Sequence, residues 1–202
     1  MKNILYSILL LAMFAACSKD ENRDFENMTF QELYGGRPYR GTAKAIITGV
    51  GATEQTIDGD GRIVLMDETA DSVSLVFLAD FGKTGEVNMK LRGKQDGNSF
   101  RVEGDNIPGF FRVSNESIQG DIDNPTQTMK FAGTLKREQG ILQLEVYFKE
   151  ATESFPQGSS LKLHLETSRK LPQEGDDTSG CQTRVVPIWG PNGMTMGIVP
   201  DC

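Results

Sequence analysis

The sequence predicts an all-β protein, an antiparallel meander of strands that closes as a barrel or, alternatively, packs as a two-sheet sandwich. Most of the chain alternates apolar and polar residues with a period of two, which sends neighbouring side chains of a strand to opposite faces. Glycine-containing turns separate these runs, and short links between successive strands favour antiparallel hairpins. No long segment shows a helical period, so we expect only one short N-terminal helix.

The clearest alternating run places Leu161, Leu163 and Leu165 on one face of a strand, with polar residues between them. Similar runs lie at 142–148, 72–77 and 86–92, and weaker candidates lie at 42–48, 62–66, 99–103, 110–113 and 129–136. Together they predict roughly eight to ten strands, each with one solvated face. Turns are predicted at 58–61 (Asp-Gly-Asp-Gly), 95–98, 137–140 and 156–158, where glycine permits positive φ.

The predicted helix begins at a capping box formed by Thr29 and Glu32. Gly35 and Gly36 are expected to end it. Its apolar side would plug one end of the β body.

The N-terminus has the features of a secretory signal peptide, residues 1–16. Lys2 precedes an apolar run from Ile4 to Phe14, which is much shorter than the roughly 20 residues that a membrane-spanning helix needs. The run ends in two alanines directly before Cys17. This ending resembles the lipobox of bacterial lipoproteins, with Phe14 where leucine is usual, and it implies that Cys17 is the acylated first residue of the mature chain. An ordinary signal peptide with an incidental cysteine is the alternative.

Two further resemblances concern the Bacteroidetes group. Residues 18–22 resemble the acidic export signal of lipoproteins displayed on the cell surface, although a solvated linker would look the same, so surface and periplasmic positions both stay open. The lipidated cysteine, short tether and meander are similar to the calycin-like or lipocalin-like β-barrels of such lipoproteins. This resemblance spans Tyr39 to about Thr167 and implies an apolar cavity if the barrel closes.

Composition limits the partners. Removal of residues 1–16 from the 202 leaves 186 residues, enough for one domain, with a formal charge of about −8 because one of the 21 basic residues is lost against 28 acidic ones. This balance, without a cluster of Lys and Arg, argues against nucleic acid as a partner. Attachment to the membrane would come through the N-terminal lipid.

We expect four segments: the signal peptide, 1–16; a tether and short helix, 17–38; the β-barrel domain, 39–167; and a linker with a C-terminal loop, 168–202. Cys181 and Cys202 form an even pair in an oxidising compartment and predict a disulfide worth about 3 kcal/mol, with two free thiols as the alternative. The loop carries Trp189, the only tryptophan, which would contact a partner or anchor the loop to the barrel.

The sequence favours a non-enzymatic protein without a cofactor or a metal. His164, the only histidine, is expected on the outward face of its strand, and no G-x-S-x-G motif occurs. One histidine and no closely spaced cysteines do not make a zinc site. Residues 58–61 fit a turn better than a calcium loop. Asp71-Ser72-Val73 is similar to a Bacteroidetes O-glycosylation signal at Ser72, and a plain turn is the alternative.

The leading hypothesis is therefore a lipoprotein of the outer membrane whose barrel binds a small apolar ligand. An accessory protein of a surface complex, with a filled core, is the alternative. A carboxylate-dependent glycoside hydrolase is the weaker third possibility, because the sequence does not single out a pair of carboxylates.

Overall fold

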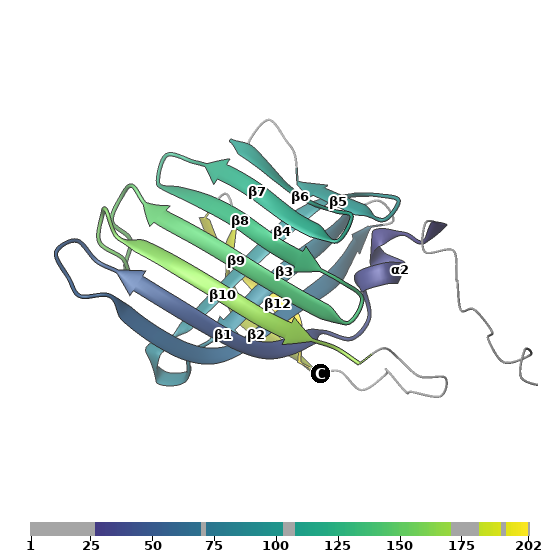
Figure 1. Cartoon of the computed structure of the whole chain (residues 1–202), viewed down its shortest axis with the longest axis horizontal. Helices are drawn as coiled ribbons and strands as arrows, with labels where there is room; N and C mark the ends of the chain where they lie inside the picture. The colour runs from purple at the N-terminus through teal and green to yellow at the C-terminus, as the bar shows by residue number, and fades with distance from the viewer. Residues whose placement is uncertain (1–26, 70–71, 103–107, 171–181, 191–192, 202) are drawn as a thin grey trace, which may run out of the picture.

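Ten strands form one closed antiparallel barrel in meander order, and a C-terminal hairpin joins it from outside (Figure 1). The computed structural model describes residues 27–69, 72–102, 108–170, 182–190 and 193–201. The elements are α2 (Phe30–Tyr34), β1 (Tyr39–Thr48), β2 (Gln55–Thr69), β3 (Ser72–Asp80), the 3₁₀ turn η2 (Gly82–Thr84), β4 (Glu86–Asp96), β5 (Ser99–Val102), β6 (Gly109–Ser114), β7 (Ser117–Asp123), β8 (Gln127–Leu135), β9 (Gln139–Phe148), β10 (Ser160–Ser168), β11 (Gln182–Gly190) and β12 (Gly193–Asp201).

Strand pairing runs without a break around the barrel. β1 pairs with β2 on one side and with β10 on the other, and each remaining strand pairs with its neighbours in the chain. The β4–β5 ladder, in which Gln95 lies opposite Phe100, joins the two halves of the meander. Because closure leaves the barrel without an open edge, the predicted barrel is confirmed and the sandwich alternative is wrong.

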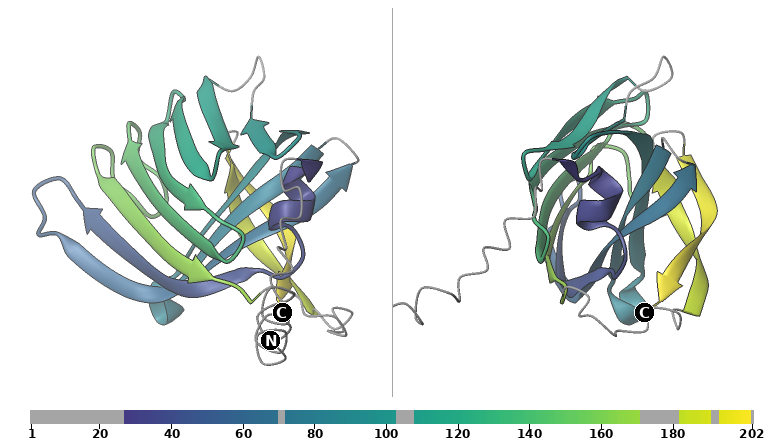
Figure 2. Two further views of the ribbon diagram at one scale, coloured as in Figure 1. Left: turned by 45° about the vertical axis from the view of Figure 1, so that its right-hand side comes forward. Right: turned by 90° about the vertical axis from the view of Figure 1, so that its right-hand side faces the viewer.

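Helix α2 seals one end of the barrel (Figure 2). The predicted capping box is present: the Thr29 side chain accepts a hydrogen bond from the Glu32 backbone N–H, and the Glu32 carboxylate accepts one from the Thr29 backbone N–H at 2.7 Å. Phe30 is fully buried, and its backbone N–H donates to the Gly97 carbonyl at 2.7 Å. The helix is therefore fixed to the turn between β4 and β5.

Arg169, just after β10, ties the sealed end together. Its guanidinium donates to the carbonyl oxygens of Leu33 (2.6 Å), Tyr34 (2.8 Å) and Gly35 (2.5 Å) at the end of α2, and to Arg137 O (2.5 Å). These bonds satisfy carbonyls that the end of a helix leaves without partners. The guanidinium carbon also lies 4.5 Å from the centroid of the Tyr39 ring, in the first strand. Burial lowers the pKa of Arg169, and the bonds to carbonyl dipoles offset the cost of burying its charge.

Aromatic side chains fill the half of the interior next to α2. Phe100 stacks on Phe30 with ring centroids 5.4 Å apart and meets Phe111 edge-on at 6.0 Å. Phe111 in turn contacts Phe131 at 5.0 Å and Phe77 at 6.2 Å. Such edge-on and stacked contacts contribute beyond simple burial. This half of the barrel is a packed core.

The predicted turn at 58–61 is wrong, because these residues lie inside strand β2. Asp58 and Asp60 are exposed, whereas Gly59 and Gly61 face the interior. A Cβ on Gly61 would lie 2.6 Å from the Thr42 carbonyl oxygen and 3.1 Å from a methyl carbon of the Leu165 side chain. Aspartate and glycine mark a turn only where the backbone takes positive φ. Here they are extended, and the glycines give room for close packing inside the wall.

The expectation that every strand has one solvated face is also wrong for β3. Its residues from 73 to 79 are all buried. Val76 and Leu78 point outward and pack with Val64 of β2 and Val186 of β11 in a second apolar cluster outside the barrel. Figure 2 shows the β11–β12 hairpin lying against this wall. The serines at the start of β3 made its outer face look solvated, although Val76 and Leu78 farther along the strand make that face apolar.

We expect Arg169→Leu to lower the free energy of unfolding by about 3 kcal/mol, because several buried carbonyls lose a charged donor. Arg169→Lys should recover only part of the loss, since an ammonium does not reproduce the planar fork of the guanidinium. Arg112→Leu is the control, because the Arg112 side chain is exposed and its described contacts are hydrogen bonds to Gln119 and the exposed Phe110 ring, 5.7 Å from the guanidinium carbon. Urea titration measures all three, and equal losses for Arg169→Leu and Arg112→Leu would contradict the assigned role.

Candidate binding site

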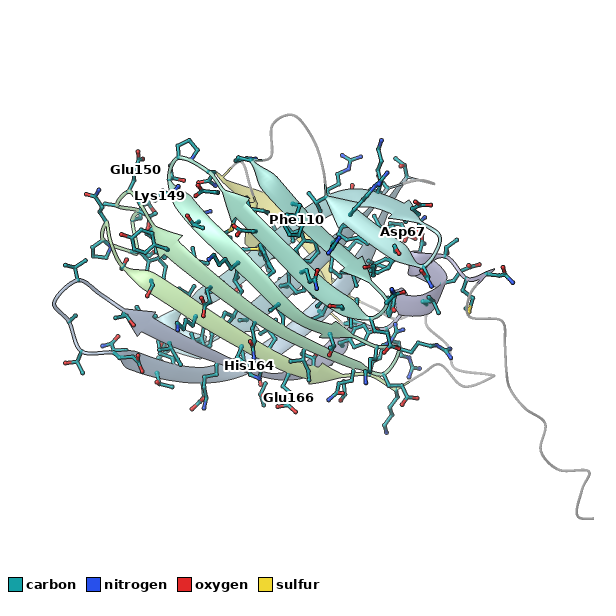
Figure 3. The ribbon with its side chains drawn as sticks, turned by 45° about the horizontal axis from the view of Figure 1, so that its top comes forward. Asp67, Phe110, Lys149, Glu150, His164 and Glu166 are labelled. Atoms are coloured by element: carbon teal, nitrogen blue, oxygen red, sulfur yellow. The ribbon has the colours of Figure 1, made fainter. Side chains whose placement is uncertain are left out.

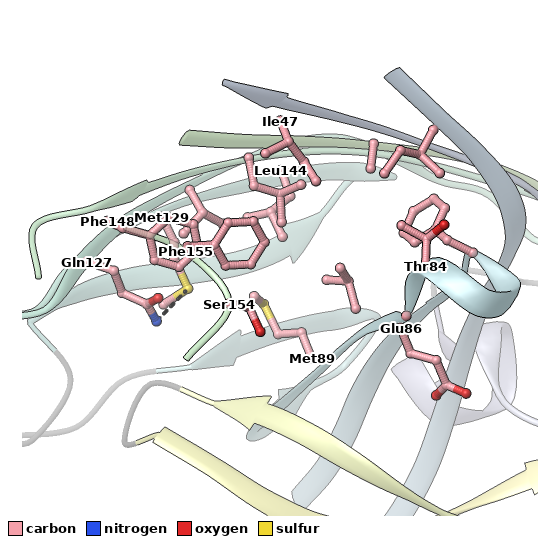
Figure 4. A pocket seen from close by; sticks show the side chains of 17 residues that line it. Ile47, Thr84, Glu86, Met89, Gln127, Met129, Leu144, Phe148, Ser154 and Phe155 are labelled. Carbon is pink, nitrogen blue, oxygen red and sulfur yellow. Dashed lines mark hydrogen bonds between the residues drawn. The ribbon is translucent and has the colours of Figure 1, made fainter. Parts of the chain in front are cut away.

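A cavity of about 260 Å³ opens at the end of the barrel opposite α2 (Figure 4). Six strands and two connections contribute to it, and most of the lining is apolar. The lining residues are Ala45, Ile47, Ile57, Phe81, Thr84, Gly85, Glu86, Val87, Met89, Gln127, Met129, Leu144, Val146, Phe148, Ser154, Phe155 and Leu161.

The barrel is hollow here because its inward residues are smaller than at the sealed end. Ala45 of β1 faces the interior with 1% of its surface exposed and lies opposite Leu163 of β10 and Ile57 of β2. None of the phenylalanines of the packed core lines the cavity. Three other described aromatic residues do, and they come from a strand end and from connections: Phe81, Phe148 and Phe155. The side chains therefore line the wall without filling the centre.

The β9–β10 connection forms one side of the mouth. Its Phe155 ring stacks on Phe148, with centroids 4.4 Å apart and planes 9° from parallel. Thr152 holds the turn, because its hydroxyl oxygen accepts the Phe155 backbone N–H at 2.9 Å. Gly158 has φ +81°, and a Cβ there would lie 2.9 Å from a methyl carbon of Val50 in the β1–β2 connection. The two connections are thus in contact beside the opening.

Gln127, the first residue of β8, is the buried polar side chain of the cavity wall. Its exposed fraction is 9%, and it lies opposite Phe148 in the β8–β9 ladder. Its amide nitrogen donates to the Met129 sulfur at 3.7 Å (Figure 4). A thioether is a weak acceptor, and a carboxamide offers two donors and an acceptor. The Gln127 side chain therefore keeps hydrogen-bonding capacity at the edge of an apolar space.

On the described connections around the mouth, acidic groups outnumber basic ones. The connections at 49–54, 81–86, 124–126 and 149–159 carry four carboxylates, Glu54, Glu86, Glu150 and Glu153, and two ammonium groups, Lys83 and Lys149. Figure 3 shows Lys149 and Glu150 at this end of the barrel. The Lys149 ammonium binds the Asp123 carboxylate and donates to the Asn124 carbonyl at 3.1 Å.

The arrangement suits binding of a small apolar molecule. Apolar walls favour transfer of a ligand from water, and a few polar groups fix its orientation. Glu86 is the only charged residue among the described lining residues, and its carboxylate accepts a bond from the Asn88 amide at 2.9 Å and points away from the apolar groups in Figure 4. Within the parts of the chain that the structure describes, no three His, Cys, Asp or Glu side chains gather as metal ligands.

The candidate residues from the sequence are not among the described residues that line the cavity. Cys17, Cys181 and Cys202 lie outside the described part of the chain. The remaining three are placed elsewhere. Ser72 begins β3, with its hydroxyl oxygen 2.9 Å from that of Thr69. Trp189 lies in β11, where its backbone is in register with Met89 of β4. His164 is on the outer face of β10, as Figure 3 shows.

Sequence reasoning did not single out Gln127, Phe155 or Ala45 as site residues. The periodic pattern identified the inward face of several strands, but inward residues look alike whether they fill a core or line a cavity. The signal that was present is the size of the residues in the middle of the inward faces: alanine, methionine and leucine line the cavity, whereas Phe77, Phe100, Phe111 and Phe131 fill the packed core.

Comparison with models of protein families, with curated proteins and with solved structures found no match. Among the described residues, no helix is long and apolar enough to cross a membrane. Arguments about function therefore depend on the site itself.

Two alanines on β1 test whether the cavity is empty space. Ala43 and Ala45 both face inward and are 2% and 1% exposed, but only Ala45 lines the cavity. We expect Ala43→Leu to lower the free energy of unfolding by about 2 kcal/mol through overpacking. Ala45→Leu should leave it unchanged or raise it by up to about 1 kcal/mol, since the added atoms enter the cavity. Thermal and urea unfolding measure both variants; equal destabilisation would mean that the barrel is filled throughout.

Proposed function

We propose that this protein is a lipid-anchored lipoprotein of the bacterial outer membrane, of the Bacteroidetes type, whose barrel binds a small apolar ligand and catalyses no reaction. The observation that carries the proposal is the apolar cavity at the end of the barrel away from α2. The opposite end is packed, so a ligand would enter beside Phe155 and stop at the aromatic core.

The size of the cavity limits the ligand. Its volume of about 260 Å³ lies just below the roughly 300–1,000 Å³ of common small-molecule sites. The proposed ligand is therefore a compact molecule, or one chain of a larger lipid whose remainder stays outside. With a gain of about 0.8 kcal/mol for each buried methylene, less the cost of association, we expect dissociation constants on the order of micromolar.

The N-terminal residues support the membrane part of the proposal. A short apolar run followed by two alanines and Cys17 resembles a lipobox. Several acyl chains on one cysteine would hold the protein on a bilayer permanently, whereas a single chain binds only marginally. The barrel would then work beside a membrane, where apolar ligands are concentrated.

The alternative function is that of an accessory protein in a surface complex. The specific feature in its favour is the β11–β12 hairpin, because β12 ends the described sheet order and pairs there with β11 alone. An unpaired strand edge can accept a strand from a partner. The cavity does not require such a partner, so ligand binding is the first proposal.

We expect the neutral probe N-phenyl-1-naphthylamine to bind saturably, one molecule per protein, with a rise in fluorescence as it leaves water. Ala45→Phe should weaken binding at least tenfold, because the added ring occupies the cavity beside Ile57. Ala132→Phe adds the same ring on the exposed face of β8 and should leave binding unchanged. Absence of saturable binding, or equal binding by Ala45→Phe and the unmodified protein, would refute the cavity as the site.

We also expect Cys17→Ser to abolish acylation and retention in the membrane fraction, because the thiol that accepts the lipid is lost. Incorporation of labelled fatty acid by cells expressing each form measures this directly. Ser18→Ala is the control and should keep its label. Continued labelling of the Cys17→Ser protein would refute the anchor.

A further inference from the structure

The lining of the cavity distinguishes between classes of apolar ligand by their polar group. Fatty acids and other anionic lipids need a cation or a set of convergent N–H donors where the charge is buried. Among the described lining residues there is no Lys, Arg or His, and the one charged residue, Glu86, is itself an anion. The described wall therefore offers no cationic side chain to a buried carboxylate, and its side-chain donors are the Gln127 amide and the Thr84 and Ser154 hydroxyls.

The mouth does not supply that compensation either. Of the two ammonium groups on the described connections, Lys149 is bound to Asp123 and Asn124, so its charge is already paired. Lys83 is exposed on η2. The described connections around the opening also carry four carboxylates: Glu54, Glu86, Glu150 and Glu153. A carboxylate that stayed in solvent at the mouth would therefore meet more acidic than basic groups on the described connections.

Gln127 shows what the cavity can hold instead. The side chain is about nine-tenths buried, and its described side-chain partner is the Met129 sulfur. A carboxamide has two N–H donors and an acceptor oxygen, so a ligand that carries a hydroxyl, ketone or amide could form a further hydrogen bond with it. Phe148 lies opposite Gln127 in the ladder and stacks on Phe155, so this polar position is next to the covering loop and not at the floor of the cavity.

We infer that the ligand is an uncharged molecule with an apolar body and one hydrogen-bonding group, which bonds to the Gln127 amide, and that the cavity discriminates against carboxylates of the same chain length. This inference rests on the proposed ligand-binding function. The apolar body would occupy the space between Ala45, Met129 and Leu161, and its polar group would point toward the mouth.

A series with one alkyl chain tests the inference: 1-decanol, decanoate and decylammonium, each displacing N-phenyl-1-naphthylamine from the protein at pH 8. We expect 1-decanol to displace the probe at a concentration at least tenfold below that of decanoate, with decylammonium between them. Displacement by decanoate at an equal or lower concentration would overturn the inference while leaving the binding function intact. If neither the probe nor any of the three compounds binds, the proposed function fails as well.

Gln127→Leu separates the hydrogen bond from simple burial. It should raise the displacing concentration of 1-decanol about tenfold and leave the direct binding of the probe within twofold. Gln143→Leu makes the same change on the exposed outer face of β9 and should alter neither. An unchanged value for 1-decanol in a folded Gln127→Leu protein would overturn the assigned contact.

A gain of function gives an independent test that does not require Gln127 to be changed. Ser154 lines the mouth beside Phe155, so Ser154→Lys places an ammonium where the polar group of the ligand is expected. Decanoate should then bind about tenfold more tightly, while 1-decanol changes less than twofold. Ser154→Gln is the uncharged control. If Ser154→Lys does not improve decanoate binding, the polar group does not lie at this position and the inference is wrong.

Discussion

Closing ten strands into one barrel fixes the width of the interior, and every inward side chain must then fill that width or leave a space. At the α2 end five phenylalanines meet one another across the centre, and the core is packed. At the other end Ala45, Met129 and the leucines only coat the wall. One barrel therefore has a solid half and a hollow half, and the size of the inward side chains contributes to the difference.

The solid half depends on how its end is closed. A helix as short as α2, five residues, has little stability of its own in water. It stays in place because Phe30 enters the aromatic core and because the Arg169 guanidinium binds the carbonyls at its end. Arg169 follows the last strand of the barrel and stacks on Tyr39 in the first. The same side chain thus joins the helix, the start of the barrel and its end, and it leaves the opposite end as the place for an opening.

Much of the fold could be predicted from the sequence, because period-two alternation is a local property. The leucines at 161, 163 and 165 and the capping box at Thr29 both appear where they were expected. The predictions were wrong where the same local pattern occurs in two different structures. The Asp-Gly pattern at 58–61 is a turn signal that here lies within a strand, and Val76 in β3 is an outward residue covered by the distant β11. The cavity could not be predicted, since it depends on which inward residues meet across the barrel.

The hairpin that covers β3 also bears on the site. Val186 packs on Val76 and Leu78 from outside, and β11 is in register with β4 at Met89, a lining residue. The wall made by β2, β3 and β4 is therefore supported from outside next to the hollow half. Empty space inside a protein tends to collapse when its walls can move, because the lining atoms lose contacts across the gap. A wall held from outside resists that collapse. The cavity can then exist before a ligand arrives, and little of the binding energy is spent on rearranging the barrel.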